Sequence, residues 1–341
     1  MNRTKISILL TTYRRPEWLK LAITSVLRQN FSRFELLILD DASGDETEST
    51  VKKFKDKRIR YLKNKKNLGF PGTFRRGVLA ATGKYIFLLS DDDLILQKDT
   101  LSYVYETMEQ KNLGYAQLGL VFYEESPRNP TSIATTDKVR DYYIPPSEAI
   151  ILKTINWHIG FASGNIYLTE AVVLKDIIEN VWLSHVKPIF RMINKFGAYY
   201  MGSRFILGRI SKTGNISHLN VDVNKGYHLE SLLKLYREFD YSKERYHKFE
   251  KLHIEGVIKS LLGIKYYTSS RNLLKIIKVI LKINKKYILA PRLWINLITA
   301  LMLPKFVLNQ IRNIRLQKNK KSLEKILKKI QFEKNVSRLL R

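Results

Sequence analysis

Residues 87–96 read FLLSDDDLIL, a stretch that places three consecutive carboxylates, Asp91, Asp92 and Asp93, between two apolar runs. Neighbouring like charges repel, and burying them without partners costs on the order of several kcal/mol. A compensating cation is therefore expected, and aspartates at a strand end are hard oxygen ligands of the kind that Mg²⁺ and Mn²⁺ prefer. The alternative is that they cap a helix, since Asp favours helix N-termini.

The sequence around this stretch alternates short β-branched runs with helical patterns, as βαβ units on a parallel sheet do. Strands are predicted at 5–10, 34–39, 59–62 and 85–89. Because ligands of open parallel sheets bind beyond the carboxyl ends of the strands, polar residues there predict a site. Three strand ends carry them: Thr11-Thr12-Tyr13, Asp40-Asp41 and the three aspartates.

The charge of the chain is unevenly distributed. The 341 residues carry a formal net charge of +29, and residues 261–341 hold 20 Lys and Arg against two acidic residues. From about residue 229 the pattern turns helical and basic, as in 273–283 and 322–330. We therefore predict two parts, 1–225 and 226–341. The absence of cysteine excludes disulfides and thiolate metal sites.

The basic part offers cationic, amphipathic helices. Such helices suit adsorption to an anionic membrane surface, which ranks first here; a solvated helical appendage ranks second. Nucleic acid ranks last as a partner, since the region has no recognisable nucleic-acid motif. The apolar segment 287–308 is interrupted by Pro and basic residues, so it is expected to lie on a membrane or to pack in a core. The apolar run 6–10 is too short for a signal peptide, so a cytoplasmic start is expected.

Two segments carry recognisable motifs in order. Residues 5–47 contain a Thr-Tyr turn followed by Arg-Pro, then S-V-L-x-Q and D-D-x-S-x-D-x-T, and residues 67–95 contain N-x-G and the acidic stretch. Together they resemble family 2 glycosyltransferases, inverting enzymes of the GT-A fold that use nucleoside diphosphate sugars. The resemblance implies a Rossmann-like, mostly parallel α/β sheet flanked by helices, to which this chain adds a basic helical C-terminal extension.

The resemblance also implies a nucleotide site. Thr11 and Tyr13 would frame the nucleobase and ribose, and Asp41, with Asp40 beside it, would hydrogen-bond the base. A carboxylate accepts the N–H of uracil or thymine, so UDP or dTDP sugars are the expected donors. The alternative for Asp40 and Asp41 is capping of the helix that begins near residue 46. Arg76 is expected to reach phosphate, or else to be solvated surface.

The metal ligand is not settled by the motif. Many relatives have D-x-D-D here, and Ser90 stands where the first Asp would be. Asp92 or Asp93 is therefore expected to bind Mg²⁺ or Mn²⁺, and Asp91 is assigned to the nucleotide. His218 is a further candidate that could approach the metal from a C-terminal loop.

An inverting transfer needs a base that takes the proton of the acceptor hydroxyl. The family usually places a carboxylate before an aromatic-Arg pair, which is Phe190-Arg191 here, and that position resembles His185. A neutral imidazole can act as this base, although a lone His is more often structural. Asp176 and Glu179 are the fallback candidates.

These observations predict a metal-dependent inverting glycosyltransferase acting on a saccharide acceptor, lipid-linked, in cell-surface polysaccharide or glycan assembly. It would work in the cytoplasm, peripherally on the inner face of the membrane. A sugar-1-phosphate nucleotidyltransferase is the rival enzyme, but it needs a Gly-rich loop after the first strand, and TTYRRPEW has no glycine. The other alternative is a non-catalytic basic binding or scaffold protein on a degenerate transferase fold.

Overall fold

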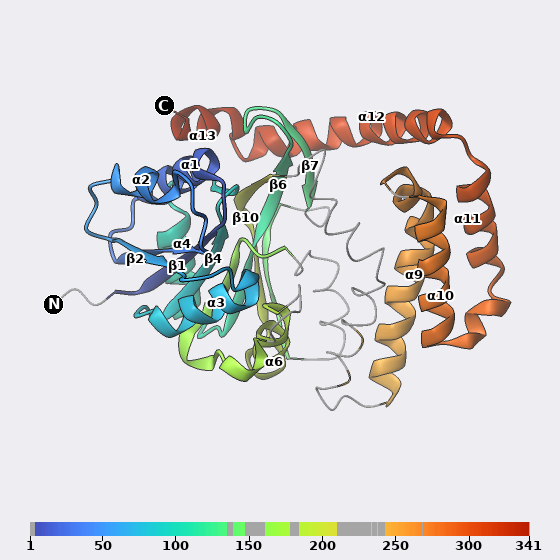
Figure 1. The fold of residues 1–341 in the computed structure, drawn as a ribbon, viewed down its shortest axis with the longest axis horizontal. Coiled ribbons are helices and arrows are strands. Elements are labelled where there is room, and N and C mark those ends of the chain that lie inside the picture. The colour runs from blue at the N-terminus through green and yellow to red at the C-terminus, as the bar shows by residue number, and fades with distance from the viewer. Residues whose placement is uncertain are drawn as a thin grey trace. The chain divides into compact units, whose positions relative to one another are not determined.

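A computed structural model of the protein describes residues 4–134, 139–146, 161–177, 184–209, 233, 237, 243–267 and 269–340. The chain divides into two compact units (Figure 1). The first unit comprises residues 1–209 together with 325–341, and the second comprises 210–324. The predicted boundary at 225/226 lies outside the described residues.

The first unit is an α/β unit. Its elements are β1 (Ile6–Thr12), α1 (Pro16–Leu27), β2 (Phe34–Asp40), α2 (Thr47–Lys52), β3 (Ile59–Lys63), α3 (Gly69–Ala80), β4 (Tyr85–Ser90), β5 (Leu94–Ile95), α4 (Thr100–Gln110), β6 (Tyr115–Tyr123), β7 (Pro130–Ala134), β8 (Asp141–Ile144), β9 (Asn165–Leu168), α6 (Val186–Phe196), β10 (Ala198–Arg209) and α13 (Phe332–Leu339), with 3₁₀ turns at Thr169–Ala171 and Leu174–Asp176.

One sheet joins these strands in the order β3-β2-β1-β4-β9-β6-β10-β5, with β7 paired to β6 and β8 to β10. Strands β1, β2, β3 and β4 run parallel, so their carboxyl ends lie at one edge, as predicted. The register pairs Thr12 with Asp40 and Thr11 with Ser90. The polar residues that follow β1, β2 and β4 therefore start from the same level of the sheet.

The middle strands read as continuous apolar runs because both faces are covered. The side chains of β1, β2 and β4 are almost all buried, and Figure 1 shows α1 and α3 on opposite sides of the sheet. Gly77 lets α3 approach closely, since a Cβ at this position would lie 2.4 Å from Leu39 Cδ1 and 3.0 Å from Leu9 Cδ1. The four central strands thus form a fixed platform for the residues that follow them.

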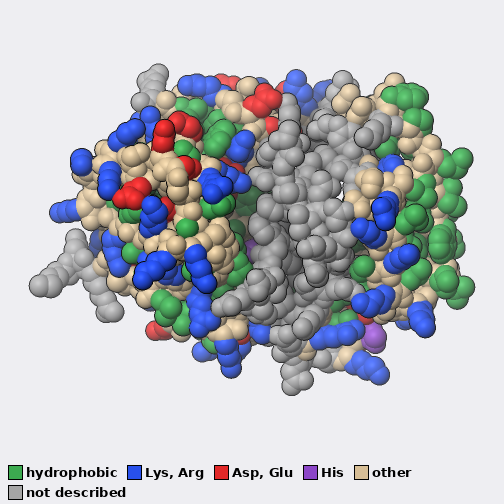
Figure 2. All heavy atoms as spheres, viewed as in Figure 1, with side chains coloured by type: hydrophobic (Ala, Val, Ile, Leu, Met, Phe, Trp, Pro, Cys, Tyr) green, Lys and Arg blue, Asp and Glu red, His purple; other side chains and the backbone are tan. Residues whose placement is uncertain are grey.

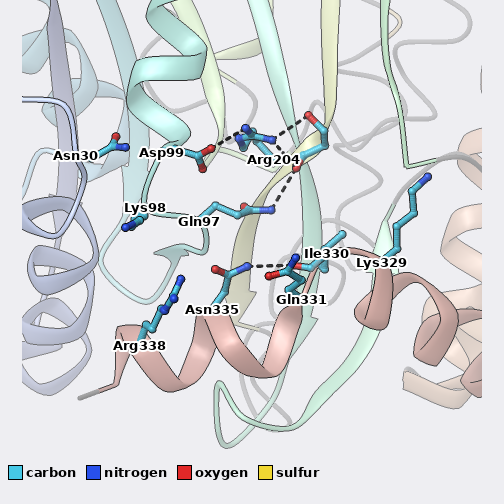
Figure 3. A pocket seen from close by; sticks show the side chains of 11 residues that line it. Asn30, Gln97, Lys98, Asp99, Arg204, Lys329, Ile330, Gln331, Asn335 and Arg338 are labelled. Carbon is cyan, nitrogen blue, oxygen red and sulfur yellow. Dashed lines mark hydrogen bonds and ion pairs between the residues drawn. The ribbon is translucent and has the colours of Figure 1, made fainter.

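The C-terminal helix α13 belongs to the first unit. Arg28 Nη1, at the end of α1, donates to the carbonyl oxygen of Leu339 at 2.6 Å and also to that of Arg338. A pocket of about 440 Å³ lies between α13, the turn before α4 and β10 (Figure 3). Its lining residues are Asn30, Gln97, Lys98, Asp99, Ser203, Arg204, Lys329, Ile330, Gln331, Asn335 and Arg338.

The second unit is helical in its described part. Its elements are α9 (Lys243–Tyr267), α10 (Ser270–Ile283), the 3₁₀ helix η3 (Lys285–Leu289), α11 (Pro291–Met302) and α12 (Lys305–Lys329), which continues into the first unit. Helix α11 packs on α9 through buried Leu293, Leu297 and Ala300, and Asn296 Nδ2 donates to Ile258 O at 2.9 Å. Across the described residues, every helix is too short or too polar to cross a bilayer.

Candidate active site

Three buried aspartates follow β4. The exposed fractions of Asp91, Asp92 and Asp93 are 3%, 7% and 2%. They lie in a tight turn that is closed by a 3.2 Å hydrogen bond from the backbone N–H of Asp93 to the carbonyl oxygen of Ser90. Because water is largely excluded, each carboxylate depends on partners from other elements.

Asp91 ties the end of β4 to the loop after β1. Its Oδ2 accepts hydrogen bonds from Thr12 Oγ1 at 2.8 Å and from the backbone N–H of Tyr13 at 3.2 Å. Its Oδ1 lies 3.2 Å from Arg15 Nη1. Thr11, predicted to frame the nucleobase and ribose, is half-buried near the end of β1, and this role stays a prediction. Its neighbour Thr12 makes the contact to Asp91.

Asp92 faces two cations. Its Oδ2 lies 2.9 Å from Arg15 Nη1 and 3.8 Å from Arg209 Nη1. The guanidinium of Arg209 also stacks on Trp18, 4.1 Å from the ring centroid, and this contact orients it. Arg15 and Arg209 were not among the site residues predicted from the sequence, although Arg15 belongs to the Arg-Pro step of the motif after β1.

Asp93 is held by neutral donors. Its Oδ2 accepts from Ser163 Oγ at 2.5 Å and its Oδ1 accepts from the backbone N–H of Arg209 at 2.9 Å. Ser163 also accepts from the backbone N–H of Ser90 at 2.8 Å. Gly164, with φ +82°, provides the left-handed backbone that follows Ser163. Ser163 therefore lies against the aspartates.

The electrostatics of this cluster favour a cation. Burial and the neighbouring Asp92 raise the pKa of Asp91 to about 7, although Arg15 opposes the rise. Burial also raises the pKa of Asp92 and, together with repulsion from Asp92, raises that of Asp93 well above its usual range. Two arginines therefore leave the negative charge of the three carboxylates incompletely compensated.

The donor set fits a divalent cation held by one or two protein carboxylates. Both oxygens of Asp91 and Asp93 accept hydrogen bonds from other elements, whereas Asp92 meets Arg15 and Arg209 through the same oxygen, Oδ2. Mg²⁺ and Mn²⁺ commonly take one or two carboxylates and complete their shell with water and substrate phosphate. Within the described part of the chain, no three His, Cys, Asp or Glu side chains cluster as a metal site. His218 lies outside the described residues.

The first aspartate after β2 shapes a turn. Asp40 Oδ1 accepts from the backbone N–H of Ser43 at 2.9 Å and from Ser43 Oγ at 2.6 Å, and its Oδ2 accepts from Tyr61 OH. Burial and the facing Asp40 carboxylate raise the pKa of Tyr61, so the phenol stays a donor. These contacts hold the turn after β2 and do not cap α2, where the backbone N–H of Thr47 donates to Asp45 Oδ1 instead. The contact of Asp40 with a base stays a prediction.

Asp41 anchors the N-x-G turn. Its Oδ1 accepts from Asn64 Nδ2 at 2.8 Å and from the backbone N–H of Leu68 at 2.7 Å. Arg76 Nη1 donates to Asn64 Oδ1 at 2.5 Å. The structure thus brings Asp41 and Arg76, both predicted for the nucleotide site, together through Asn64, which the sequence analysis did not single out.

The loops after β1 and β2 are fixed to each other. The backbone N–H of Arg14 donates to Ser43 Oγ at 3.0 Å, and Arg14 and Ala42 both have left-handed backbones, with φ of 55° and 62°. Such strained residues cluster at functional sites. Tyr13 lies 40% exposed beside them, with the Arg14 guanidinium 5.0 Å from its ring centroid. This ring offers an accessible stacking surface for a base.

The candidate base His185 precedes α6 and is buried. Its ring meets Phe70 edge to face, with centroids 5.7 Å apart, and Phe70 in turn stacks on Phe74. His185 therefore lies against α3, the helix that also carries Arg76. Its role as the base stays a prediction.

The fallback candidates are placed differently. Asp176 is buried and forms a bidentate ion pair with Arg191, with 2.5 Å between Oδ2 and Nε and 3.1 Å between Oδ1 and Nη2. Hydrogen bonding to Asp176 raises the pKa of Arg191. A carboxylate engaged in this way connects its 3₁₀ turn to α6, which favours a structural role over proton transfer. Glu179 lies outside the described residues.

A comparison with models of protein families shows the family of this chain. The family model described as Glycosyl transferase family 2 matches residues 7–178, just over half of the chain. The chain belongs to glycosyl transferase family 2. The match includes β1, β2, β4 and the three aspartates, so the family assignment and the GT-A α/β fold predicted from the sequence are confirmed.

Curated relatives of this glycosyltransferase match about a third of the chain. An uncharacterized glycosyltransferase of Rickettsia conorii is 43% identical over 113 residues, which are 33% of this chain and 18% of that protein. WfgD of Escherichia coli, a UDP-Glc:α-D-GlcNAc-diphosphoundecaprenol β-1,3-glucosyltransferase, is 30% identical over 30% of this chain and 46% of its own. A GalNAc(5)-diNAcBac-PP-undecaprenol β-1,3-glucosyltransferase of Campylobacter jejuni is 35% identical over 33% and 37%. The chain thus spans less than half of the length of these relatives.

Solved structures share the fold over more of the chain. S. aureus TarS 1–349 in complex with UDP-GlcNAc has a TM-score of 0.60 at 16% identity and covers 87% of this chain and 90% of that one. The mannosyltransferase PcManGT of Pyrobaculum calidifontis, in complex with GDP-Man and Mn²⁺, has a TM-score of 0.52 at 16% identity, with 87% and 86% covered. At this identity the likeness concerns the fold alone.

Proposed function

We propose that this protein transfers a sugar from a nucleoside diphosphate donor, UDP or dTDP, to a saccharide acceptor with inversion at the anomeric carbon. The observation that carries the proposal is the buried cluster of Asp91, Asp92 and Asp93, joined to the loop after β1 and faced by Arg15 and Arg209. The negative charge of such a cluster favours the binding of a cation, and the cation can in turn bind the diphosphate of a substrate.

Asp92 is the residue that would hold Mg²⁺ or Mn²⁺. When bound, such an ion would supply Lewis-acid stabilisation to the departing diphosphate, so that the leaving group needs no proton. Arg15 and Arg209 place two further cations at the same carboxylate and are suited to contact phosphate oxygens. Asp91 and Asp93 keep their protein partners and fix the geometry of the turn.

Tyr13 and Asp41 are proposed to bind the nucleoside. The exposed Tyr13 ring can stack on the base, and Asp41 can accept the N–H of uracil or thymine. Arg76, held next to Asp41 through Asn64, would contribute positive charge on the phosphate side. The name of the relative WfgD includes UDP-Glc as donor, which supports a uridine donor here.

His185 is proposed to take the proton of the acceptor hydroxyl as that oxygen attacks the anomeric carbon from the face opposite the diphosphate. A neutral imidazole can do this near neutral pH. The new C–O bond forms as the bond to the diphosphate oxygen breaks, and this single displacement inverts the configuration.

The acceptor is proposed to be a lipid-linked saccharide in cell-surface polysaccharide or glycan assembly. Two relatives carry undecaprenol-linked acceptors in their names, which supports this class of acceptor. The enzyme would then work in the cytoplasm at the inner face of the membrane, with its basic C-terminal region towards anionic lipid.

Donor turnover tests the proposal. The purified protein is incubated with UDP- and dTDP-sugars, with GDP- and CDP-sugars as comparison, in Mn²⁺ or in EDTA, and release of the nucleoside diphosphate is measured. We expect metal-dependent release from one UDP- or dTDP-sugar and, with a lipid-linked acceptor, a product of inverted anomeric configuration by NMR. Equal release in EDTA, or a retained configuration, would refute the metal role or the inversion.

A further inference from the structure

Helix α11 has apolar side chains on two opposite faces. Its sequence, PRLWINLITALM, contains one charged residue, Arg292. One face, with Leu293, Leu297 and Ala300, is buried against α9. A soluble surface helix would present polar residues on the opposite face, and a helix with a second apolar face needs a second apolar environment.

The opposite face of α11 is exposed and equally apolar. Ile295 is 61% and Met302 77% exposed, and Trp294, Ile298 and Leu301 are exposed at the same helical spacing. The patch extends beyond both ends of the helix. It includes Leu289 of η3, which is 82% exposed, and Phe306 at the start of α12, which is 64% exposed. Figure 2 shows these hydrophobic side chains gathered over α11, at the right of the view. We call the set from Leu289 to Phe306 the α11 face.

The residues around the α11 face carry positive charge. Between Gly256 and Leu323 the sequence has fifteen Lys and Arg and no Asp or Glu. Lys282, Lys285 and Lys286 are exposed just before the face, and Arg292 is exposed within it. The acidic residues Glu250 and Glu255 of α9 lie near Tyr287 of η3, and the lysines and arginines outnumber them. An apolar face with a mainly cationic border complements an anionic lipid surface.

The length of α11 indicates how it would bind. Twelve residues of α-helix extend about 18 Å, well short of the roughly 30 Å hydrocarbon core of a bilayer. Its buried face is already packed on α9, which leaves the α11 face for lipid. The helix would therefore lie in the plane of the interface, with Trp294 at the headgroup level.

We propose that the α11 face inserts into the interface of an anionic bilayer and thereby holds the enzyme on the membrane. A second copy of the chain fits less well, because two such faces would bring together two borders in which Lys and Arg outnumber the acidic residues. The proposal deepens the proposed function by naming the surface that would bring the enzyme to a lipid-linked acceptor.

Vesicle co-sedimentation tests the insertion. The full chain is mixed, without nucleotide, with vesicles of phosphatidylcholine alone or mixed with phosphatidylglycerol. We expect it to bind the mixed vesicles, and Ile295→Glu to weaken this binding about tenfold or more. Leu79→Glu, at a position that is 66% exposed on α3, makes the same charge change on an equally exposed apolar residue and should bind as the parent does.

A fluorescent label locates the inserted face. Because the chain has no cysteine, Ile298→Cys and Leu79→Cys each provide one attachment site for an environment-sensitive dye. We expect the emission of the dye at residue 298 to shift to the blue with phosphatidylglycerol vesicles, and that at residue 79 to stay unchanged. Unchanged emission at residue 298, together with parent-like vesicle binding of Ile295→Glu, would overturn the proposal.

The parent protein could instead bind neither kind of vesicle and form a concentration-dependent dimer that Ile295→Glu abolishes. This result would assign the α11 face to a second copy of the chain and would also overturn the proposal. Vesicle binding is measured separately from donor turnover. A protein that binds vesicles through the α11 face but turns over no donor would refute the proposed function and leave this inference standing.

Discussion

The end of β4 and the α11 face depart from the usual distribution of side chains in opposite directions. At the end of β4 three carboxylates are buried, and burial raises their pKa values. On α11 large apolar side chains are exposed to solvent, although the helix already buries its other face. Each arrangement costs stability in the isolated chain, and for this reason we propose a ligand for each: a cation with diphosphate at the first and lipid at the second.

The two regions also differ in whether the family model matches them. The family match covers β4 and ends before the helical unit, so the first region is interpreted within a known family. The second is interpreted from exposure and charge alone. Buried carboxylates and exposed apolar side chains therefore point to binding sites both where a family match exists and where none does.

The largest effect is expected at Asp92. Asp92→Asn keeps the shape of the side chain but removes the charge that would hold a cation, so donor turnover should fall about a thousandfold or more. Asp56→Asn changes an aspartate that pairs with Arg58 in the loop before β3, and should be nearly silent. Steady-state kinetics in Mn²⁺ distinguish the two, and parent-like turnover of Asp92→Asn would remove the metal role from this residue.

His185 is expected to come next. His185→Ala should lower kcat about a hundredfold with little change in the KM for the donor, because the base acts in the chemical step. His247→Ala, at an exposed position on α9, is the matched control. If His185 is instead structural, its variant will lose thermal stability, while kcat of the folded fraction stays near that of the parent.

The pKa of Asp91 predicts a pH dependence for the metal-free protein. The folded state holds a proton up to about pH 7, whereas an unfolded Asp releases it near pH 3.9, so folding is favoured at low pH. This stabilisation is complete below about pH 4 and is lost as the pH rises to about 7. Between about pH 4 and pH 7 the unfolding free energy should therefore decrease less in Asp91→Asn than in the parent, by on the order of a few kcal/mol. Denaturant titration at several pH values measures this difference. An unchanged slope would mean that Asp91 is ionised throughout.

The two faces of α11 provide the smallest and sharpest contrast. Leu297→Ala, on the face packed against α9, should cost about 2–3 kcal/mol in unfolding free energy. Ile295→Ala, two residues away on the exposed face, should change it by less than about 0.5 kcal/mol. Thermal or urea unfolding measures both. Equal costs would show that Ile295 is packed in the protein and that the α11 face is not open to a partner.

Sequence reasoning predicted the parts of the site that lie within motifs. The four parallel strands and the placement of Asp91, Asp92 and Asp93 at the sheet edge follow from local patterns, because each strand end carries its own polar residues. It could not predict that Arg209 of β10 and Ser163 would meet these aspartates. Those contacts depend on pairings between residues far apart in the chain.

The second unit shows the same limit. The apolar pattern of 287–308 predicted either a membrane contact or a buried core, and the structure shows that α11 has one buried face and one open face. Helix α13 looked like part of the basic extension, yet it packs in the first unit, where Arg28 binds its last carbonyls. Tertiary packing decided both, and periodicity alone carries no such information.

The most direct test of the central claim is calorimetric titration of the protein with UDP, dTDP, GDP and CDP, each in Mn²⁺ and in EDTA, for the parent and for Asp92→Asn. The account predicts selective binding of UDP or dTDP that requires Mn²⁺ and is lost in the variant, because the cation links Asp92 to the diphosphate. Binding that is equally tight in EDTA and in Asp92→Asn would contradict the assignment of the three aspartates as the cation site. If none of the four nucleotides binds to the folded parent, the transferase proposal itself is wrong.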